Sequence, residues 1–583
     1  MSRGAGNSDT TASGARFTDV WLLFLRRPFG ARGGAASAQP RDAGHVALLV
    51  AAILVGALCA LPIVAVAVEA LGGFLGDGSD TLGRLARTLL PGYARTTLLI
   101  MGAVGLGTFV IGTGTAWAVT ACEFPLRRGL EIALVVPLAF PAYVLAYAYT
   151  DLLDHPGAVQ TLLRDLTGWG PRDYWFPEVR SEGGAALMLS LVLYPYVYLL
   201  ARAAFLLQGI GPFVVARSLG ATPWRAFRDV ALPMAGPAVT GGVLLALMET
   251  IADFGTVAHF GVQTLATGIY TTWFTLGDRT ASAQIALGLL AIALLLVGLE
   301  RLRARNGAHL AQPANRMPHP RIRLSGAKAV LAIVGCGLPV LLGAAIPLVM
   351  LGSLAFDAHQ SWATGRYLLF LSNSVVLASV AAVMTMLAAI VLGYHRRLSG
   401  SLGSRLLFAM GRLGYAVPGG VIAVGLFVPF AGIDNALDAV MRERFGISTG
   451  LVLSGSIALL LAAYIVRFLA AALGAWRGAE ATLSPDLDRA ALGFGASPWT
   501  LFSRIHLPIL MPAAFTGALL VFVDTMKELP ATLIVRPFGW DTLAVQAYRL
   551  AADERLEGAA VPSLMIVAAG LLPVILLARR LAR

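Results

Sequence analysis

A 19-residue segment of this chain occurs twice. The segment GATPWRAFRDVALPMAGPA at Gly220–Ala238 returns as GASPWTLFSRIHLPILMPA at Gly495–Ala513, with 9 of 19 positions identical and a constant offset of 275. Each copy is more polar than the apolar runs around it and has a Gly turn, a Pro-Trp start, a short helical stretch and a Leu-Pro exit. This layout predicts a short amphipathic helix between two membrane spans, presented to a partner. The two copies divide the chain into two equivalent halves.

The composition excludes a soluble domain. Of the 583 residues, 57% are hydrophobic and 13% are charged, and the mean hydropathy is +0.75. A soluble domain of this length would have to expose more polar side chains to water than this composition supplies. The apolar residues gather in runs of about 20, the length that crosses about 30 Å of hydrocarbon. We therefore expect an all-α polytopic membrane protein with six spans in each half. The twelve predicted spans are 46–72, 97–121, 129–150, 186–207, 237–258, 282–299, 328–352, 374–394, 405–430, 450–474, 509–530 and 560–578.

The charges predict which ends of the spans face the cytoplasm. Arginines are dense before the first span and after the sixth, whereas the loop after the third span is acidic. By the positive-inside rule, the arginine-rich regions, both repeat segments and both termini are expected to be cytoplasmic. An even number of spans per half makes the halves a parallel repeat. The net charge of +12 is then a topology signal, and nucleic acid is not an expected partner.

The same reasoning predicts four regions along the chain. We expect a disordered cytoplasmic tail over 1–44, a first membrane repeat over 45–299, a basic cytoplasmic linker over 300–327 and a second membrane repeat over 328–583. A duplicated and fused gene is the simplest account of the two repeats.

Several kinds of site are not expected. Cys59, Cys122 and Cys336 lie in or beside apolar runs without metal-type spacing, so we expect packing residues and no disulfide framework. The eight histidines show no ligand spacing, and no metal site is predicted. The pattern G-x-x-x-x-G-K-[ST] is absent, since neither Lys328 nor Lys527 follows a glycine. We expect no catalytic residues and no bound cofactor.

Both repeat segments resemble the cytoplasmic EAA loop in permease subunits of binding-protein-dependent ABC importers. The family pattern is Glu-Ala-Ala, three residues, Gly and a later Leu-Pro. The leading triplets here are 214–216 (Val-Val-Ala) and 489–491 (Arg-Ala-Ala), so the family's Glu is missing from both. The resemblance implies the type I ABC importer permease fold and a coupling helix that docks in a groove of a separate ATPase, which hydrolyses the ATP. Two loops imply two copies of the ATPase.

The residue types of the loops suit this role. Pro223 and Pro498 fit a first helical turn, where a missing N–H is no loss. Aromatic side chains beside them are expected to anchor a partner. The alternative is an interfacial helix whose Trp rests at the lipid headgroups. The predicted ATPase-coupling residues are Gly220, Ala221, Pro223, Trp224, Phe227, Leu232, Pro233, Gly495, Ala496, Pro498, Trp499, Phe502, Leu507 and Pro508.

Two further segments bear on the substrate. Met248–Phe274 and Val523–Ala560 are similar to the fused permeases of ferric-iron importers, to which a periplasmic binding protein delivers Fe³⁺. Fused permeases for thiamine or aminoethylphosphonate look broadly alike, so these solutes stay open. A secondary transporter or channel would explain the spans equally well but not two docking loops. The expected partners are the ATPase, a periplasmic binding protein and the lipid of a bacterial inner membrane.

Ionisable residues inside predicted spans mark a candidate translocation path. These residues are Glu249, Asp253, Asp524, Lys527 and Glu528. The spacing predicts that Glu249 and Asp253 share one helical face, and that Asp524, Lys527 and Glu528 share another. Charges at that depth must face a cavity or one another, so a polar path lining and a structural ion-pair network both stay open. Lys527 is expected to be ion-paired.

Tyrosines cluster in the third and fourth predicted spans, at Tyr143, Tyr147, Tyr149, Tyr194, Tyr196 and Tyr198. Phenolate oxygen suits hard Fe³⁺, but Tyr near span ends ordinarily belongs to an interfacial belt. We expect belt or packing positions.

Overall fold

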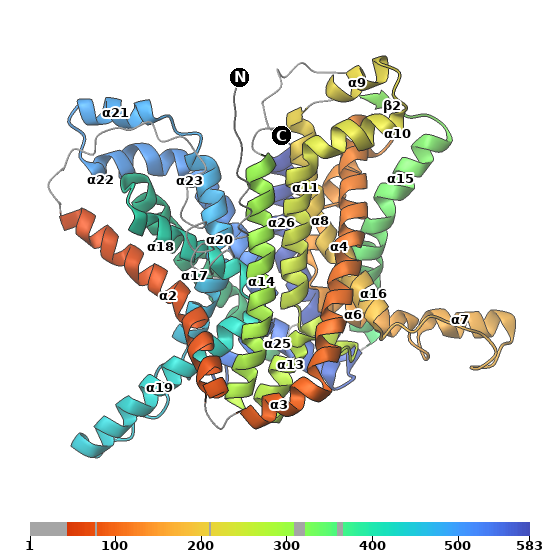
Figure 1. The fold of residues 1–583 in the computed structure, drawn as a ribbon. Helices are drawn as coiled ribbons and strands as arrows, with labels where there is room; N and C mark the ends of the chain where they lie inside the picture. The colour runs from red at the N-terminus through yellow and green to blue at the C-terminus, as the bar shows by residue number, and fades with distance from the viewer. Residues whose placement is uncertain (1–42, 76–78, 209–210, 308–320, 358–364, 583) are drawn as a thin grey trace, which may run out of the picture.

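The computed structural model describes residues 43–75, 79–208, 211–307, 321–357 and 365–582 (Figure 1). The predicted tail over 1–44 lies almost wholly outside these residues, as does the middle of the predicted linker. The regular secondary structure of these residues is helical apart from two strands of two residues each, as the all-α prediction requires.

The first half contains fourteen described helices and one strand. Their bounds are α2 (Ala43–Leu75), α3 (Ser79–Thr88), α4 (Leu90–Ala121), β1 (Cys122–Glu123), α5 (Arg127–Ala133), η1 (Val136–Ala139), α6 (Ala142–Leu153), α7 (Ala158–Thr167), α8 (Glu182–Gln208), α9 (Gly211–Ser218), α10 (Pro223–Ala226), α11 (Leu232–Ala252), α12 (Gly255–His259), α13 (Leu265–Tyr270) and α14 (Arg279–Gly307). Two π-helical turns complete this half, η2 (Phe227–Ala231) and η3 (Thr271–Thr275).

The second half repeats this order. Its elements are β2 (Ile322–Arg323), α15 (Ala327–Val340), η4 (Leu341–Ala345), α16 (Ile346–Asp357), α17 (Gly365–Leu398), α18 (Leu402–Leu413), η5 (Gly414–Ala416), α19 (Gly419–Phe445), α20 (Ile457–Glu480), α21 (Pro485–Gly493), α22 (Pro498–Thr500), η6 (Leu501–His506), α23 (Leu507–Met526), α24 (Pro530–Val535), α25 (Leu543–Ala552) and α26 (Leu556–Ala582). Helices α8 and α20 begin 275 residues apart, as do α11 and α23, so the offset of the repeat segments extends into the membrane helices.

The described helices include eleven that are long and apolar enough to cross a membrane, and up to twelve if one bent pair counts as a span. The bent pair corresponds to the third predicted span, 129–150, which is not one straight helix: its two parts, Arg127–Ala139 and Ala142–Thr167, meet at 94°. The ninth predicted span, 405–430, is likewise interrupted between α18 and α19.

A proline explains both interruptions. Pro141 and Pro418 have extended backbone, with ψ of 140° and 145°, and each immediately precedes a helix, α6 or α19. Because proline lacks an N–H and its ring crowds the preceding turn, the earlier helix stops there. Apolar composition continues across both sites, which is why a count of apolar residues predicted continuous spans.

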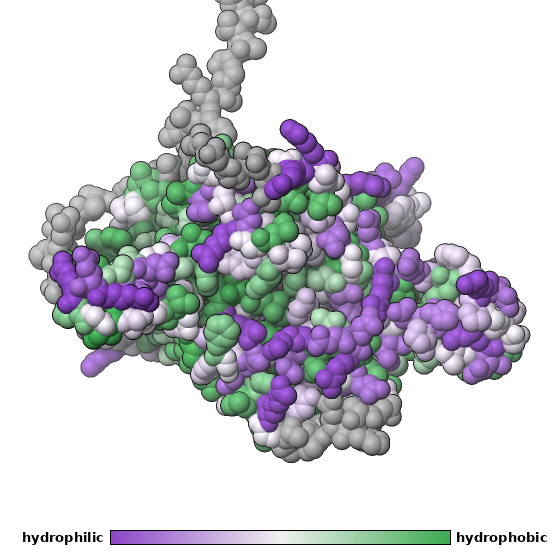
Figure 2. Space-filling view, turned by 90° about the horizontal axis from the view of Figure 1, so that it is seen from below, coloured by the Kyte–Doolittle hydropathy of each residue, from purple (hydrophilic) through white to green (hydrophobic). Residues whose placement is uncertain are grey.

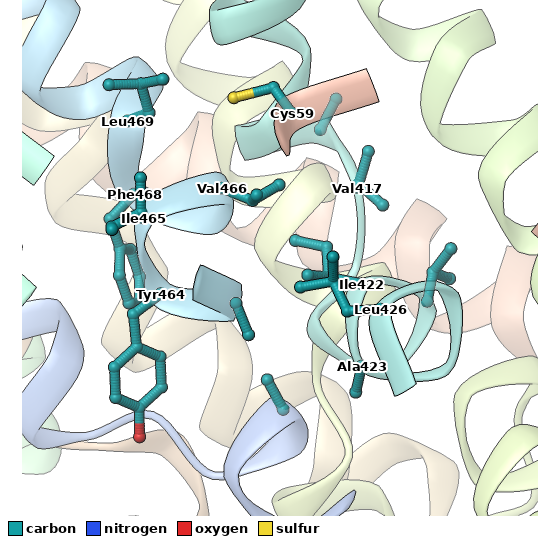
Figure 3. Close-up of a cluster of buried hydrophobic side chains, with 14 of the residues drawn as sticks. Cys59, Val417, Ile422, Ala423, Leu426, Tyr464, Ile465, Val466, Phe468 and Leu469 are labelled. Atoms are coloured by element: carbon teal, nitrogen blue, oxygen red, sulfur yellow. The ribbon is translucent and has the colours of Figure 1, made fainter. Parts of the chain in front are cut away.

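The first helix of each half packs on the other half. Helix α2 contacts α17, α18 and α19, whereas α15 and α16 contact α4, α5 and α6. Figure 3 shows Cys59 of α2 in one cluster of buried side chains with Val417 and Ile422 of the second half. All three cysteines are buried with free thiols, which confirms their packing role. The halves are therefore interlocked.

The two repeat segments lie at one end of the bundle, here called the loop end, with α9, α10, α21 and α22 (Figure 1). At this end β1 pairs with β2 in parallel, which ties the start of the second half to the first. At the opposite end, here called the far end, α7 and the last turns of α19 project sideways as two arms. Figure 2 looks onto the far end and shows hydrophilic residues at the tips of both arms.

Candidate functional site

Each repeat segment begins with the predicted glycine turn. Gly220 has a φ of +89° and Gly495 a φ of +79°, a left-handed region that side chains with a Cβ rarely adopt. The next helix then begins with a polar cap and a proline at its first position. Thr222 Oγ1 accepts a hydrogen bond from Arg225 N at 3.3 Å, and Ser497 Oγ accepts one from Thr500 N at 3.1 Å.

The Leu-Pro pair shapes the exit of each segment. Pro233 and Pro508 have no N–H, so the carbonyl four residues earlier has no helical donor. The helix widens to a π turn, in which Leu232 N–H bonds Phe227 O and Leu507 N–H bonds Phe502 O. The predicted short helix is consequently not separate: α10 and α22 run through η2 and η6 into α11 and α23. Each repeat segment is thus continuous with a membrane helix.

The aromatic residues of the segments face in two directions. Trp224 and Trp499 are 66% and 72% exposed. Phe227 instead packs inward against Trp117, with ring centroids 5.0 Å apart, and Phe502 packs against Tyr394 at 4.6 Å. Each phenylalanine thus holds its segment to its own half, whereas the neighbouring tryptophan is exposed at the loop end. The role of these side chains in ATPase coupling stays a prediction.

The two segments rest on different supports. In the first half Trp117 also lies 5.2 Å from Phe213, in an aromatic cluster. In the second half the residue 275 positions after Phe213 is Asp488, which bonds His506 Nε2 at 2.8 Å and pairs with Arg397 at 2.8 Å. The two segments thus have the same backbone conformation but pack on different side chains, an aromatic cluster in the first half and the charged partners of Asp488 in the second.

The predicted path residues lie where two membrane helices break off. Helix α11 ends at Ala252 and α23 at Met526. Asp253 and Glu528 follow these ends, so the prediction that they share a helical face with Glu249 and Asp524 is wrong. The i, i+3 and i+4 spacing of the charged residues favoured one continuous helix in each case, although Pro530 follows the second break.

The displaced carboxylates start the next short helices. Asp253 Oδ1 accepts hydrogen bonds from Thr256 N at 3.1 Å and Val257 N at 3.3 Å, and Glu528 Oε1 accepts one from Ala531 N at 2.8 Å. These donors belong to the first turns of α12 and α24, which have no partner within the helix. Discontinuous membrane helices of this kind typically mark substrate sites in transporters.

Arg467 of α20 joins the two halves electrostatically. Its guanidinium lies 3.0 Å from Glu528 Oε2 and 3.7 Å from Glu249 Oε2, and its side chain is 9% exposed. Our sequence analysis missed this residue. The sequence feature that could have indicated it is a single arginine within a run of apolar residues. The equivalent residue of the first half is Val192.

Lys527 pairs with Asp524, with Nζ and Oδ1 3.0 Å apart. The expected ion pair is therefore confirmed. Both side chains are 20% exposed, so the pair borders a space rather than lying in the packed core.

That space is a cavity of about 90 Å³ between the halves. Helices α6, α8 and α11 line it from the first half, and α20, α23 and α24 from the second. It gathers all five predicted path residues together with Arg467, so that four carboxylates face two cations. A larger vestibule of about 510 Å³ begins at Tyr196 and Asp524, which line both spaces, and includes Glu300 and Arg412 toward the loop end.

The clustered tyrosines are not an interfacial belt. Tyr143, Tyr147, Tyr149, Tyr194 and Tyr198 are each at most 5% exposed. Tyr149 and Tyr198 donate to backbone carbonyls, Leu342 O and Glu131 O, as packing residues do. Tyr143 and Tyr196 line the cavity. The belt interpretation is wrong for these residues, because the third and fourth spans lie inside the bundle.

Aromatic rings from both halves lie beside the cavity toward the far end. Phe254 stacks on Tyr270 with centroids 3.8 Å apart and lies 5.6 Å from Tyr548. Tyr270 donates its hydroxyl to Pro530 O, a residue of the cavity wall. Tyr270 belongs to the segment Met248–Phe274 and Tyr548 to Val523–Ala560, the two segments that are similar to ferric-iron permeases.

A family model for binding-protein-dependent transport system inner membrane components matches residues 109–305 and 384–583. The chain belongs to this family. It is a multi-pass inner-membrane permease of an ABC importer, and the matched regions are the two repeats. A secondary transporter or channel is thereby excluded.

Relatives of this permease fall into long and short forms. It is 25% identical to the Fe(3+)-transport system permease protein FbpB 2 of Haemophilus influenzae, over 85% of this chain and 90% of that one. It is 26% identical to the probable ABC transporter permease protein y4fN of Sinorhizobium fredii, over 86% and 90%. The molybdenum transport system permease protein ModB of Escherichia coli, 26% identical, matches 36% of this chain along 89% of its own length. One half of the permease thus corresponds to a whole short relative.

Each carboxylate of the cavity has a cation or a row of N–H groups close by. Among the described residues, no three His, Cys, Asp or Glu side chains converge as a metal site.

Proposed function

We propose that this permease carries ferric iron, delivered by a periplasmic binding protein, into the cytoplasm. The observation that carries the proposal is the cavity between the halves, in which four carboxylates face two cations. An excess of negative charge in a site of low dielectric attracts a cation strongly and repels an anion. Ferric iron is a hard cation that prefers oxygen ligands, and the cavity wall supplies carboxylate and phenol oxygens.

The same observation ranks the alternatives. An oxyanion such as molybdate, or the phosphonate group of aminoethylphosphonate, would meet repulsion at Glu249 and Asp524. Thiamine carries a single positive charge on a bulky aromatic molecule and remains the runner-up. The relatives named for ferric transport also match both halves, whereas ModB matches one.

The path runs from the aromatic rings at the far end, through the cavity, to the vestibule. We assign its lining to Glu249, Asp253, Asp524, Lys527 and Glu528, with Arg467 added. Asp524 is central to this assignment because it borders both the cavity and the vestibule. The far end faces the periplasm in this proposal, and the two arms flank the surface where the binding protein docks.

The loop end faces the cytoplasm, where two copies of a separate ATPase bind the repeat segments and hydrolyse ATP. Two exposed tryptophans at equivalent positions support this role, because large aromatic side chains dominate protein interfaces. An interfacial lipid anchor would not require the same glycine turn, cap and π turn twice.

Iron uptake tests the transported species. Cells that lack the gene should grow slowly under iron limitation, and added Fe³⁺ at high concentration should restore growth through other routes. Thiamine should not restore it. The measurement is growth together with uptake of radioactive iron and of molybdate in the same strains. A thiamine requirement without an iron phenotype would contradict the assignment.

Co-purification tests the docking surface. The tagged permease should retain two ATPase copies per chain, and Trp224→Ala and Trp499→Ala should each reduce the retained ATPase, since truncating a buried interface anchor costs about 2 kcal/mol or more. Native mass spectrometry gives the stoichiometry. Trp175→Ala, at an exposed tryptophan on the far end, is the matched control and should retain the full amount. A second permease in the complex would contradict the one-chain pore.

A further inference from the structure

The two halves contribute equivalent acidic residues to the cavity, but their basic residues are not equivalent. The acidic positions are duplicated: Glu249 corresponds to Asp524, and Asp253 corresponds to Glu528, each at the offset of 275. The basic positions are not, because Ala252 stands where the second half has Lys527. The cavity wall therefore has paired carboxylates but an ammonium on one side only.

The two cations of the cavity are held differently. Arg467 bridges a carboxylate from each half, and its planar guanidinium is almost fully buried. Lys527 contacts Asp524 from a position just past the end of α23, with a fifth of its side chain exposed to the cavity. An ammonium is a compact point charge on a flexible four-carbon stem. Arg467 is a fixed support, whereas the Lys527 ammonium can leave its partner without breaking a helix.

We propose that the Lys527 ammonium is a tethered counter-ion of Asp524. It occupies the position of the transported cation and is displaced when that cation binds. The proposal rests on the proposed function in one respect, that the cargo is a multivalent cation. Without the ammonium, Asp524 and Glu249 would bind such an ion too tightly to release it. With the ammonium in competition, binding is weak enough for the ion to pass.

Metal retention tests this role. The purified permease–ATPase complex is incubated with gallium citrate, whose Ga³⁺ is not reduced, then desalted and analysed for metal by mass spectrometry. We expect Lys527→Met to retain about tenfold more Ga³⁺ than the wild type, because one competing charge is gone. Lys527→Arg, which keeps the charge, should retain as little as the wild type. Equal retention by Lys527→Met and the wild type would overturn the proposal.

A variant of the other half gives a test that removes no charge. Ala252→Lys places a second ammonium at the position equivalent to Lys527, next to Glu249 and Asp253. We expect it to reduce iron uptake into proteoliposomes about tenfold relative to Ala252→Met, which has similar length and no charge. Both variants should capture the ATPase normally. Equal uptake by the two variants would show that an added ammonium does not compete with the cargo.

The two proposals fail in different ways. A wild type that transports iron while Lys527→Met retains no extra Ga³⁺ would overturn only the counter-ion role. A wild type that transports no iron while Lys527→Met retains Ga³⁺ would overturn only the assignment of iron.

Discussion

Replacing Arg467 with methionine is expected to destabilise the permease by about 3 to 5 kcal/mol and to abolish transport. The change leaves the buried Glu528 without the guanidinium 3.0 Å away, and it removes the cation 3.7 Å from the partly exposed Glu249. An uncompensated charge in a dry interior is among the costliest single defects in a protein. The measurement is the midpoint of thermal unfolding in detergent, read by size-exclusion chromatography, together with iron uptake.

Two further variants sharpen that result. Adding Glu528→Gln to Arg467→Met removes one orphaned charge and should recover part of the lost stability. Arg442→Met breaks an exposed i, i+4 pair with Asp438 on the α19 arm, and such pairs contribute about 1 kcal/mol at most. If Arg467→Met and Arg442→Met shift the midpoint equally, the bridge between the halves has no special role.

Gly220→Pro and Gly495→Pro should each abolish transport while the protein still inserts into the membrane. Proline fixes φ near −65°, whereas these glycines have φ of +89° and +79°. The turn could not form, and the exposed tryptophan that follows it would be misdirected. Uptake and ATPase co-purification give the measurement.

Alanine at the same positions is the matched control. A Cβ at Gly220 or Gly495 would meet nothing within 4 Å, so Gly→Ala adds backbone strain of about 1 to 2 kcal/mol and no clash. The alanine variants should transport at reduced rates. Full transport by either proline variant would contradict the coupling role of its segment.

Features encoded by neighbouring residues could be predicted from the sequence. The glycine turns, the proline starts and the Leu-Pro exits each follow from the backbone limits of one or two residues, and the structure contains all of them. The ion pair of Lys527 with Asp524 could also be predicted, because a buried ammonium needs a nearby carboxylate and one lies three residues away.

Features that depend on distant parts of the chain could not be predicted. Arg467 reaches Glu249 only because α20 and α11, from different halves, line the same cavity. The inward direction of Phe227 depends on Trp117, more than 100 residues earlier.

The exchange of α2 with α15 and α16 has a consequence for how the permease is made. Helix α2 enters the membrane early in synthesis, but its partners in α17, α18 and α19 are translated more than 300 residues later, on the order of 15 s or more at bacterial rates. During this time one face of α2 has only lipid or its own half to contact. The first half therefore remains incomplete until the second arrives, and both must come from the same or a nearby ribosome. A single fused chain guarantees that order of assembly, which gives the fusion a purpose separate from the transport reaction.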